Sequence, residues 1–348
     1  MENISSKILG WYRQNKRELP WRETNDPYQI WISEIILQQT RVSQGYEYFL
    51  RFMERFPNVE ALASASEDEV LKYWQGLGYY SRARNLHQAA RTIAETANFP
   101  KTYEGVRALK GVGDYTAAAI CSFAYNMPYA AVDGNFYRII SRLWKIETPI
   151  DSTVGKKLFF RMANELLDKK VPGEFNQAMM DFGSLQCTPL NPDCQQCPLA
   201  ETCMAFLSGS VHDFPIKQHR TKTKDRYFNY IYVRAGIHTY LNKREENDIW
   251  RNLYELPMIE TDHNVCEEEF YKLPHLKEMI KAEENPVFKC ILKGIKHILS
   301  HRIIHATFYE VTLPEDTRSF SQFLRIREDE LEKYAVPRLV SIFFEKRL

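Results

Sequence analysis

Apolar residues recur at helical spacing through the first part of the chain, from Ile4 to about Leu207. One apolar stripe follows a cap and first turn at Asp26–Pro27, and it consists of Tyr28, Trp31, Ile32, Ile35 and Ile36. Ser66 and Glu69 have the spacing of a capping box, which marks another helix start. Further helices are predicted at Ser81–Ala97, Tyr103–Leu109, Asp114–Tyr125, Phe136–Trp144, Val154–Leu167 and Glu174–Gln186.

The pattern changes at Val211–Arg226, a basic segment that is poor in large apolar residues and has no periodicity, as is typical of a linker. Beyond it, Tyr227–Arg234 and Ala306–Leu313 are rich in aromatic and β-branched residues, which favour strands. Gln322–Leu331 and the last dozen residues are expected to be helical or mixed. We therefore predict a mainly α domain at 1–208, a linker at 209–226 and a smaller α/β domain at 227–348.

Length and composition agree with two folded domains. A chain of 348 residues is long for one domain, and its 44% hydrophobic residues allow real cores. The net charge of +1 gives no global sign of a nucleic-acid partner, so local patches must carry that argument. No apolar run reaches the roughly eighteen residues of a membrane span, and the first residues are unlike a secretory leader. We expect a cytoplasmic, nucleoid-associated protein that has no membrane contact.

Four cysteines follow a helical stretch closely, at Cys187, Cys194, Cys197 and Cys203. Four soft thiolates can share one metal centre and fix a short loop that has no core of its own. Zinc and unligated thiols are alternatives, but a four-thiolate zinc site usually has two CxxC pairs and this loop has one. The uneven gaps favour a [4Fe–4S] cube. The remaining cysteines, Cys121, Cys266 and Cys290, are interpreted as buried thiols.

Two glycines, Gly111 and Gly113, lie between two predicted helices in the run Leu109–Tyr115. They permit a tight hairpin, after which the free amides of the next helix face whatever lies in front of them. A plain turn is the alternative, but the run matches the longer LxGVGxxTA pattern of the helix-hairpin-helix motif. That match favours a site for a DNA phosphate.

Asp133 follows the hairpin by about twenty residues and precedes another predicted helix. An aspartate there is ordinarily an N-cap. In the helix-hairpin-helix glycosylases, however, the catalytic aspartate stands at this place. With the hairpin, the aspartate and the four-cysteine loop in this order, residues 1–207 resemble that superfamily, specifically its endonuclease III and MutY branches.

Two single residues distinguish these branches. In the endonuclease III branch, a lysine at the position of Tyr115 attacks the sugar carbon and forms a Schiff base, which tyrosine cannot do. The MutY branch requires an acid near the start of the chain, and Glu34 fits it within the run Trp31–Val42. Because Leu19–Arg22 and Gly76–Arg84 match as well, the chain resembles the MutY family of adenine DNA glycosylases over nearly its full length.

The resemblance implies a base-excision repair enzyme that hydrolyses undamaged adenine from mispairs with 8-oxoguanine or guanine and leaves an abasic site. Glu34 lies about 60° from Trp31 on a helical wheel, so a half-buried acid with a raised pKa is expected, against the alternative of a solvated glutamate. It would protonate adenine N7, while Asp133 would stabilise the cationic sugar. Tyr115 and Asn135 complete the implied catalytic set.

The adenine must first be flipped out of the duplex. The resemblance assigns its pocket to Trp21, Arg22, Leu37 and Gln177, with core packing as the alternative for Trp21 and Leu37. It assigns contacts with DNA and the oxidised base to Gln39, Thr40, Leu77, Tyr79, Gly111 and Gly113. A monovalent cation or calcium at the hairpin is a further expectation, and the [4Fe–4S] cluster of the loop at 187–203 would have a structural role.

The C-terminal part resembles the Nudix-like domain of the same enzymes through the run Trp250–Pro257. The clustered RExxEE glutamates that bind magnesium in Nudix hydrolases are missing from the sequence, so nucleotide hydrolysis is not expected. In the family a Phe-Ser-His loop recognises 8-oxoguanine, and Leu299-Ser300-His301 matches it with leucine in place of phenylalanine. Ser300 and His301 are therefore predicted to read the oxidised base.

The predicted fold is thus a two-lobed, mainly α helix-hairpin-helix glycosylase domain with an iron–sulfur loop, followed by an α/β Nudix-like domain. A monofunctional glycosylase that acts as a monomer on double-stranded DNA with A:8-oxoguanine or A:G mispairs is the leading hypothesis. A bifunctional glycosylase/lyase, a non-catalytic DNA-binding module and a nucleotide pyrophosphatase are the alternatives. The sequence identifies no protein partner, and it leaves open whether water attacks a free cation or a covalent adduct with Asp133.

Overall fold

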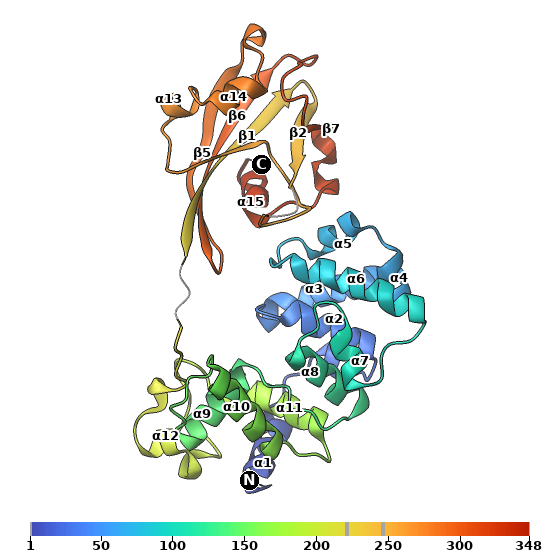
Figure 1. Cartoon of the computed structure of the whole chain (residues 1–348), viewed down its shortest axis with the longest axis vertical. Coiled ribbons are helices and arrows are strands. Elements are labelled where there is room, and N and C mark those ends of the chain that lie inside the picture. The colour runs from blue at the N-terminus through green and yellow to red at the C-terminus, as the bar shows by residue number, and fades with distance from the viewer. Residues whose placement is uncertain (1, 220–222, 245–247, 348) are drawn as a thin grey trace. The chain divides into compact units, whose positions relative to one another are not determined.

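The computed structural model describes residues 2–219, 223–244 and 248–347. Part of the predicted linker, at 220–222, and the outermost residues of both predicted domains lie outside the described residues. The chain divides into two compact units (Figure 1). The first consists of Met1–Ser64 and Asn85–Arg220, and the second of Ala65–Arg84 and Thr221–Leu348.

The first unit is helical, as the apolar spacing predicts. Its long helices are α1 (Glu2–Asn15), α2 (Pro27–Leu37), α3 (Val42–Arg55), most of α6 (Ser81–Thr96), α8 (Asp114–Tyr125), α9 (Gly134–Trp144), α10 (Thr153–Leu166) and α11 (Pro172–Asp181). Its shorter ones are η1 (Pro20–Arg22), α4 (Val59–Ser64), α7 (Tyr103–Ala108), η2 (Phe182–Gln186), η3 (Ala200–Thr202), α12 (Met204–Leu207) and η4 (Val211–Asp213).

Helix α2 lies at the centre of this unit, where it packs against α3 and α8. The predicted N-cap is present, because the side chain of Asp26 accepts a hydrogen bond of 2.9 Å from the backbone N–H of Tyr28. The sequence predicted one apolar stripe, whereas the structure also buries Ile30, Ser33 and Glu34. The prediction of a half-buried Glu34 is therefore wrong in degree: the residue is only 7% exposed, because neighbouring helices cover both sides of α2.

A second core of the first unit is formed by the inner faces of α1, α9, α10 and α11, with Tyr12, Phe136, Phe159, Phe175 and Phe182 among its members. Burying each such side chain contributes about 1.5–3 kcal/mol relative to leaving it exposed. The four cysteine side chains of the loop border this core and a smaller cluster beside it. The core therefore fixes the helices that carry the loop.

The second unit contains α5 (Glu67–Trp74) and an α/β region. Its sheet has the strand order β3-β2-β1-β6-β5, with β4 also paired to β1 and β7 to β2. The strands are β1 (Lys224–Ala235), β2 (His238–Lys243), β3 (Tyr254–Glu255), β4 (Met258–Thr261), β5 (Val287–Ile298), β6 (Arg302–Leu313) and β7 (Leu324–Arg327). Long β1 and β6 are parallel, whereas β5 and β6 form an antiparallel hairpin whose register shifts twice.

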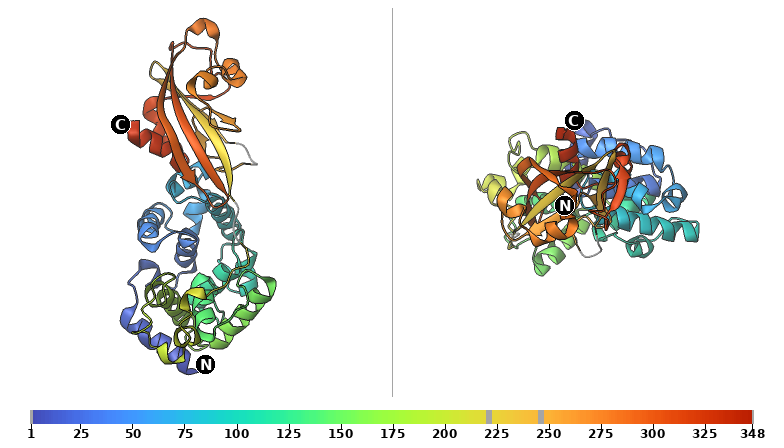
Figure 2. Two further views of the ribbon diagram at one scale, coloured as in Figure 1. Left: turned by 90° about the vertical axis from the view of Figure 1, so that its left-hand side faces the viewer. Right: turned by 90° about the horizontal axis from the view of Figure 1, so that it is seen from above.

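Helices cover both faces of this sheet (Figure 2, left). Tyr230 and Tyr232 of β1 pack with α15 (Arg338–Arg347) on one face. Ile231 and Val233 pack with α13 (Glu267–Phe270) and α14 (Pro274–Met279) on the other. Alternating residues of one strand thus serve two cores, because successive side chains point to opposite faces.

Segment Ala65–Arg84 belongs to the second unit through polar contacts as well as proximity. Ser66 caps α5 by accepting a hydrogen bond of 3.2 Å from the N–H of Glu69, as predicted. On the same helix, Asp68 accepts a hydrogen bond of 2.9 Å from Lys243 and one of 3.1 Å from Tyr254. The domain boundaries predicted from composition do not separate this segment, and they stay a prediction.

The structure differs from three local expectations or refines them. Strand β1 begins at Lys224, inside the segment expected to be a linker. Gln322–Leu331, expected to be helical or mixed, is mixed: it contains strand β7 and the start of a short 3-10 helix, η6 (Glu328–Lys333). Cys121 is buried as predicted, but Cys266 is exposed, since it caps the surface helix α13.

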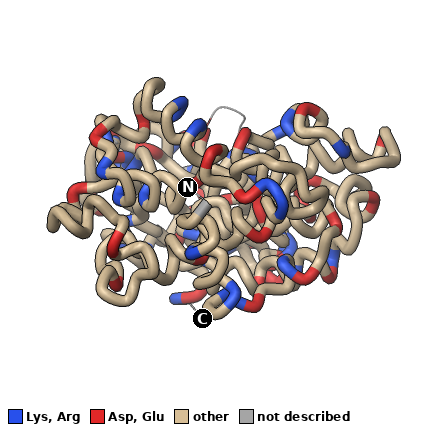
Figure 3. The backbone as a smooth tube through the Cα atoms, turned by 90° about the horizontal axis from the view of Figure 1, so that it is seen from below, with Lys and Arg blue, Asp and Glu red and all other residues tan. Residues whose placement is uncertain are grey.

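Basic and acidic residues are interspersed along the chain, in keeping with its near-zero net charge (Figure 3). In the part of the chain that the structure describes, no helix is both long and apolar enough to cross a bilayer.

Candidate active site

A cavity of about 290 Å³ lies in the first unit. Its walls come from η1, α2, α8, α11 and the segments before α3 and α9. Ten of the predicted site residues line it: Trp21, Arg22, Glu34, Leu37, Gln39, Thr40, Tyr115, Asp133, Asn135 and Gln177. Residues up to 156 positions apart in the sequence thus meet around one space that can admit a small planar molecule.

Glu34 and Tyr115 form a direct pair in this cavity, because Oη of Tyr115 donates a hydrogen bond of 2.8 Å to Oε2 of Glu34. Burial raises the pKa of Glu34 to about 7, the hydrogen bond from Tyr115 opposes that rise, and the nearby Asp133 adds to it. A carboxyl group whose pKa lies near neutrality is suited to general acid catalysis. The pair therefore provides a proton that can be held at neutral pH and given up.

Asp133 caps α9, as its position before that helix predicts. Its Oδ1 accepts hydrogen bonds of 2.9 Å from the backbone N–H groups of Asn135 and Phe136. Its Oδ2 accepts one of 2.6 Å from the side-chain amide of Asn135. Burial raises the pKa of Asp133, while these donors and Arg138 favour its anion. The carboxylate is thus fixed in one orientation at a helix N-terminus, where negative charge is stabilised.

Asn176 supports this arrangement from α11, although no sequence signal singled it out. Its side chain is fully buried, and its Oδ1 accepts a hydrogen bond of 3.0 Å from the backbone N–H of Ala131. Its Nδ2 donates to Oγ of Ser122 (2.9 Å) and to the carbonyl of Tyr129 (2.8 Å). Asn176 therefore fixes the extended segment that leads to Asp133.

A second group that sequence reasoning did not find lies behind the cavity wall. Asp181 is fully buried, and it accepts hydrogen bonds from Nη1 of Arg22 (2.7 Å) and Nη2 of Arg22 (2.8 Å). Arg17 also donates to it, from Nε and the backbone N–H. Although burial opposes it, these donors hold the pKa of Asp181 below its usual range.

Trp21 packs edge-on against Phe49 at 5.2 Å, so it belongs to both the core and the cavity wall.

The hairpin between α7 and α8 has the geometry that its glycines predict. Gly111 has a φ of 80°, and a Cβ there would meet Asn85 at 2.7 Å. Gly113 is the N-cap residue of α8, and it has no side chain that could cap the first amides of that helix. Arg107 braces the turn by donating to the carbonyl of Val112 at 2.9 Å. The predicted cation and phosphate contacts at this hairpin stay predictions.

The four loop cysteines line one small, almost wholly apolar cavity together with Arg142 of α9. Nη1 of Arg142 lies 3.4 Å from Sγ of Cys187, and its guanidinium also donates to the carbonyls of Thr188 (2.7 Å) and Pro189 (2.9 Å). Among the described residues, no three His, Cys, Asp or Glu side chains are close enough to hold a single metal ion.

The other predicted DNA-reading residues lie in the second unit. Ser300 and His301 form the tip of the β5–β6 hairpin, and Leu77 and Tyr79 precede α6. The hydroxyl of Tyr79 contacts that of Ser300, 221 positions away. Tyr79 is 47% exposed and has a φ of 48°, between Gly78 and α6, whereas Leu77 is buried. The structure thus brings together an exposed aromatic ring and the predicted reading loop.

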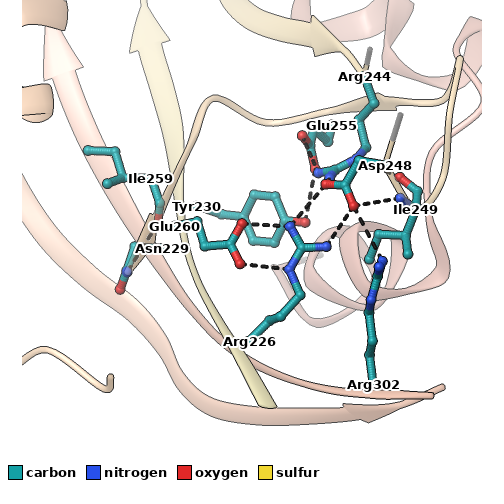
Figure 4. A network of polar contacts seen from close by, with 10 residues as sticks. All are labelled: Arg226, Asn229, Tyr230, Arg244, Asp248, Ile249, Glu255, Ile259, Glu260 and Arg302. Carbon is teal, nitrogen blue, oxygen red and sulfur yellow. Dashed lines mark hydrogen bonds and ion pairs between the residues drawn. The ribbon is translucent and has the colours of Figure 1, made fainter. Parts of the chain in front are cut away.

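Acidic groups in the sheet of the second unit are paired with arginines (Figure 4). Nη1 of Arg244 donates to both carboxylate oxygens of buried Glu255 at 2.7 Å. Arg226 joins Asp248 (2.7 Å) to Glu260 (2.6 Å). Burial opposes the effect, but Arg226, the backbone N–H of Ile249 and Arg244 lower the pKa of Asp248 to about 2. These carboxylates connect β1, β3 and β4 as ion-pair partners.

Both parts of the chain resemble known proteins. The profile of the HhH-GPD superfamily of base excision DNA repair proteins matches residues 32–159, and that of the NUDIX domain matches residues 229–346. The adenine DNA glycosylase of Buchnera aphidicola subsp. Baizongia pistaciae (strain Bp) is 33% identical over 304 residues, which are 86% of this chain and 83% of that protein. The chain belongs to the adenine DNA glycosylase family.

A further relative and a solved structure are each similar to part of the chain. The adenine DNA glycosylase of Mus musculus is 42% identical over 212 residues, 58% of this chain and 41% of that protein. A solved thermostable thymine-DNA glycosylase is 28% identical with a TM-score of 0.56, and the match covers 60% of this chain and 96% of that one. The predicted fold, a helix-hairpin-helix glycosylase domain followed by a Nudix-like domain, is confirmed. Members of this DNA-binding enzyme family hydrolyse N-glycosyl bonds, and endonuclease III-like glycosylases typically carry a [4Fe–4S] cluster.

Proposed function

We propose that this chain is a monofunctional glycosylase that removes adenine paired with 8-oxoguanine, or with guanine, from double-stranded DNA. One observation carries the proposal: a protonatable carboxyl, Glu34, and a helix-capping carboxylate, Asp133, line the same cavity. Glu34 is paired with a phenol, whereas Asp133 accepts from three N–H groups at a helix N-terminus, and two carboxyl groups held so differently can divide acid and stabilising roles between them. The size of the cavity supports a flipped-out base as the occupant.

In the proposed reaction, neutral Glu34 donates its proton to N7 of the extruded adenine, which weakens the glycosidic bond. Tyr115 orients this carboxyl through its 2.8 Å hydrogen bond. As the bond breaks, positive charge develops on the sugar, and the anion of Asp133 stabilises it. Asn135 holds Asp133 in place through its side-chain amide. The anion of Glu34 can then accept a proton from the incoming water and return to its starting state.

The absence of an amine nucleophile at position 115 supports hydrolysis without strand cleavage. A glycosylase/lyase would need a lysine that reaches the sugar carbon, and the phenol of Tyr115 is instead engaged with Glu34. We therefore expect the product to be an intact strand with an abasic site.

We also propose that Cys187, Cys194, Cys197 and Cys203 hold a [4Fe–4S] cluster, which would fix the loop and contribute no proton or electron to hydrolysis. Their apolar cavity and the guanidinium of Arg142 beside Cys187 fit four thiolates around a cube. Their spacing in the sequence, with one CxxC pair and wider gaps on either side, supports the cube over a zinc ion, whose four-cysteine sites usually have two such pairs.

For the second unit, we propose that Ser300 and His301 read the oxidised base and that Tyr79 stacks in the opened duplex. The exposure of Tyr79 and its contact with Ser300 support a shared reading site. Replacing Ser300 with alanine should then narrow the preference for 8-oxoguanine over guanine opposite adenine.

The decisive test is single-turnover release of adenine from matched duplexes with A:8-oxoguanine, A:G and A:T pairs, with and without alkali. We expect release in the first two, with strand cleavage only after alkali. Glu34→Gln should abolish release while duplex affinity persists, and borohydride should trap no covalent complex. Release from A:T at the same rate, or a trapped complex, would contradict the proposal.

A further inference from the structure

Tyr12 of α1 lies outside the cavity but contacts two of the residues that line it. Tyr12 is buried, with 4% of its surface exposed, and its Oη donates a hydrogen bond of 2.8 Å to Oε1 of Gln177. The face of the same ring lies 5.9 Å from the guanidinium carbon of Arg22. One buried side chain outside the cavity therefore contacts two side chains that line it.

The hydrogen bond from Tyr12 favours one orientation of the Gln177 amide, with Oε1 toward the phenol. A glutamine amide has a carbonyl oxygen that accepts and an NH₂ group that donates. Because Oε1 accepts from the phenol, Nε2 is the end left for the cavity. Burial, which dominates, and the neighbouring acids raise the pKa of Tyr12 despite Arg22, so its phenol stays protonated and remains a donor. In the reversed orientation the NH₂ could donate to the phenol oxygen, but the buried phenol O–H would lose Oε1, the one acceptor that the described part of the chain gives it.

Asp181 fixes Arg22 in a comparable way. The guanidinium of Arg22 has five N–H groups. Two of them donate to Asp181 and one donates to the carbonyl of Arg17 at 3.1 Å, so two remain for other partners. The side chain of Asp181 is fully buried, so this anchor is protected from water. Both lining side chains are therefore held by polar contacts on one side and keep N–H groups that these contacts do not use.

We infer that Tyr12 is a positioning residue for base recognition: it holds Gln177 so that Nε2 donates a hydrogen bond to a ring nitrogen of the flipped-out base. This inference rests on the proposed function and assigns the recognition chemistry of the same cavity. Adenine offers acceptors at N1 and N3, and a base analogue with carbon at the contacted position offers none. A buried donor left without an acceptor costs more than a missing contact in water. Tyr12 thereby contributes to selection without contacting the substrate.

The test uses the intact protein and duplexes in which adenine opposite 8-oxoguanine is replaced by 1-deazaadenine or 3-deazaadenine. Single-turnover release is measured for wild type, Tyr12→Phe, Gln177→Met and the double variant. Gln177→Met retains the length of the side chain but has no amide, so it reports the intrinsic reactivity of each base. Tyr137→Phe is the matched control, since Tyr137 packs edge-on against Phe159 and lies outside the cavity.

We expect wild type to discriminate against one deaza analogue about tenfold more than Gln177→Met does. Tyr12→Phe should lose most of that discrimination, and it should have no further effect in the Gln177→Met background. Tyr137→Phe should match wild type. An equal loss of rate for all three bases in Tyr12→Phe, additive effects in the double variant, or no deaza discrimination by wild type would each overturn the inference.

These outcomes are separable from failure of the proposed function. If wild type releases no adenine at all, the proposed function fails. If it releases adenine but the coupling between Tyr12 and Gln177 is absent, only the positioning role fails. The deaza comparison in wild type needs no variant, so the inference stays testable even if Tyr12→Phe does not fold.

Discussion

Arg138 joins Asn135 to the cysteine loop. Its Nη2 donates a hydrogen bond of 2.6 Å to Oδ1 of Asn135, and its Nε donates one of 2.8 Å to the carbonyl of Cys187. Since Asn135 in turn holds Asp133, a chain of polar contacts runs along α9 from the cavity to the first loop cysteine. The loop itself contains no Arg or Lys, and its positive charges are supplied by this helix. A change in the conformation of the loop can therefore be transmitted through Arg138 and Asn135 to Asp133.

Arg142, one turn further along α9, should be essential for the loop. It is buried, and it donates to the carbonyls of Val211, Thr188 and Pro189 as well as lying beside Cys187. Arg142→Met removes these bonds and should reduce iron per protein at least twofold and stability by about 3 kcal/mol. Iron analysis and denaturant unfolding measure both. Exposed Arg161→Met should change neither, and normal iron content in Arg142→Met would contradict the role.

Glu34→Gln should change how stability depends on pH. The pKa of Glu34 is about 7 in the folded chain and about 4.5 in the unfolded chain. The folded state thus retains the proton longer, so wild type loses stability as pH rises from about 4.5 to 7. Relative to Glu34→Gln, the loss should approach about 3 kcal/mol and level off above pH 7. Denaturant unfolding of both proteins from pH 5 to 8 measures the difference, and parallel curves would refute the raised pKa.

Tyr115→Phe should move the pH dependence of adenine release upward. The hydrogen bond from Tyr115 favours the anion of Glu34 and so lowers its pKa. Its removal raises that pKa, and the acid stays protonated to higher pH. The alkaline limb of the single-turnover rate should lie near pH 7 in wild type and at higher pH in the variant. An unchanged limb would mean that Tyr115 does not act on the pKa of Glu34.

Gly183→Ala should impair catalysis through Asn135. A Cβ on Gly183 would lie 2.4 Å from Cβ and 2.6 Å from Oδ1 of Asn135, so Asn135 has to move. Because its amide holds Asp133, kcat should fall at least tenfold while duplex affinity changes little. Gly10→Ala is the matched control, since nothing lies within 4 Å of a Cβ there. Equal activity of the two variants would show that Asn135 does not position Asp133.

Arg244→Met should destabilise the second unit. It leaves the carboxylate of Glu255, of which only 1% is exposed, without its ion-pair partner, and such a loss costs about 3–5 kcal/mol. The double variant Arg244→Met/Glu255→Leu removes both charges and should recover much of that loss. Thermal unfolding compares the three proteins. If the double variant is no more stable than the single one, the isolated charge is not the cause.

Sequence patterns predicted the helices of the first unit well, because the apolar face of a helix is formed by residues three or four positions apart. The caps at Asp26 and Ser66 were predictable for the same reason, since each depends on residues within one helical turn. Strand β7 was not predicted, because a four-residue strand depends on its partner β2 for its hydrogen bonds. The sequence also did not predict that Ala65–Arg84 belongs to the second unit, because contacts such as that between Asp68 and Lys243 join residues far apart in the chain.

The sequence by itself determined the hairpin, the spaced cysteines and the identity of the two acids, because these depend on residue type and short spacing. Only the tertiary structure decided that Glu34 is buried beside Tyr115 and that Asp133 shares its cavity, since burial and proximity come from packing between distant helices. Tyr12, Asn176 and Asp181 carry no local signal at all, and each gains its place from contacts across at least 45 positions. The sequence therefore supplies the functional groups, whereas their pKa values and the distances between them are set by tertiary packing.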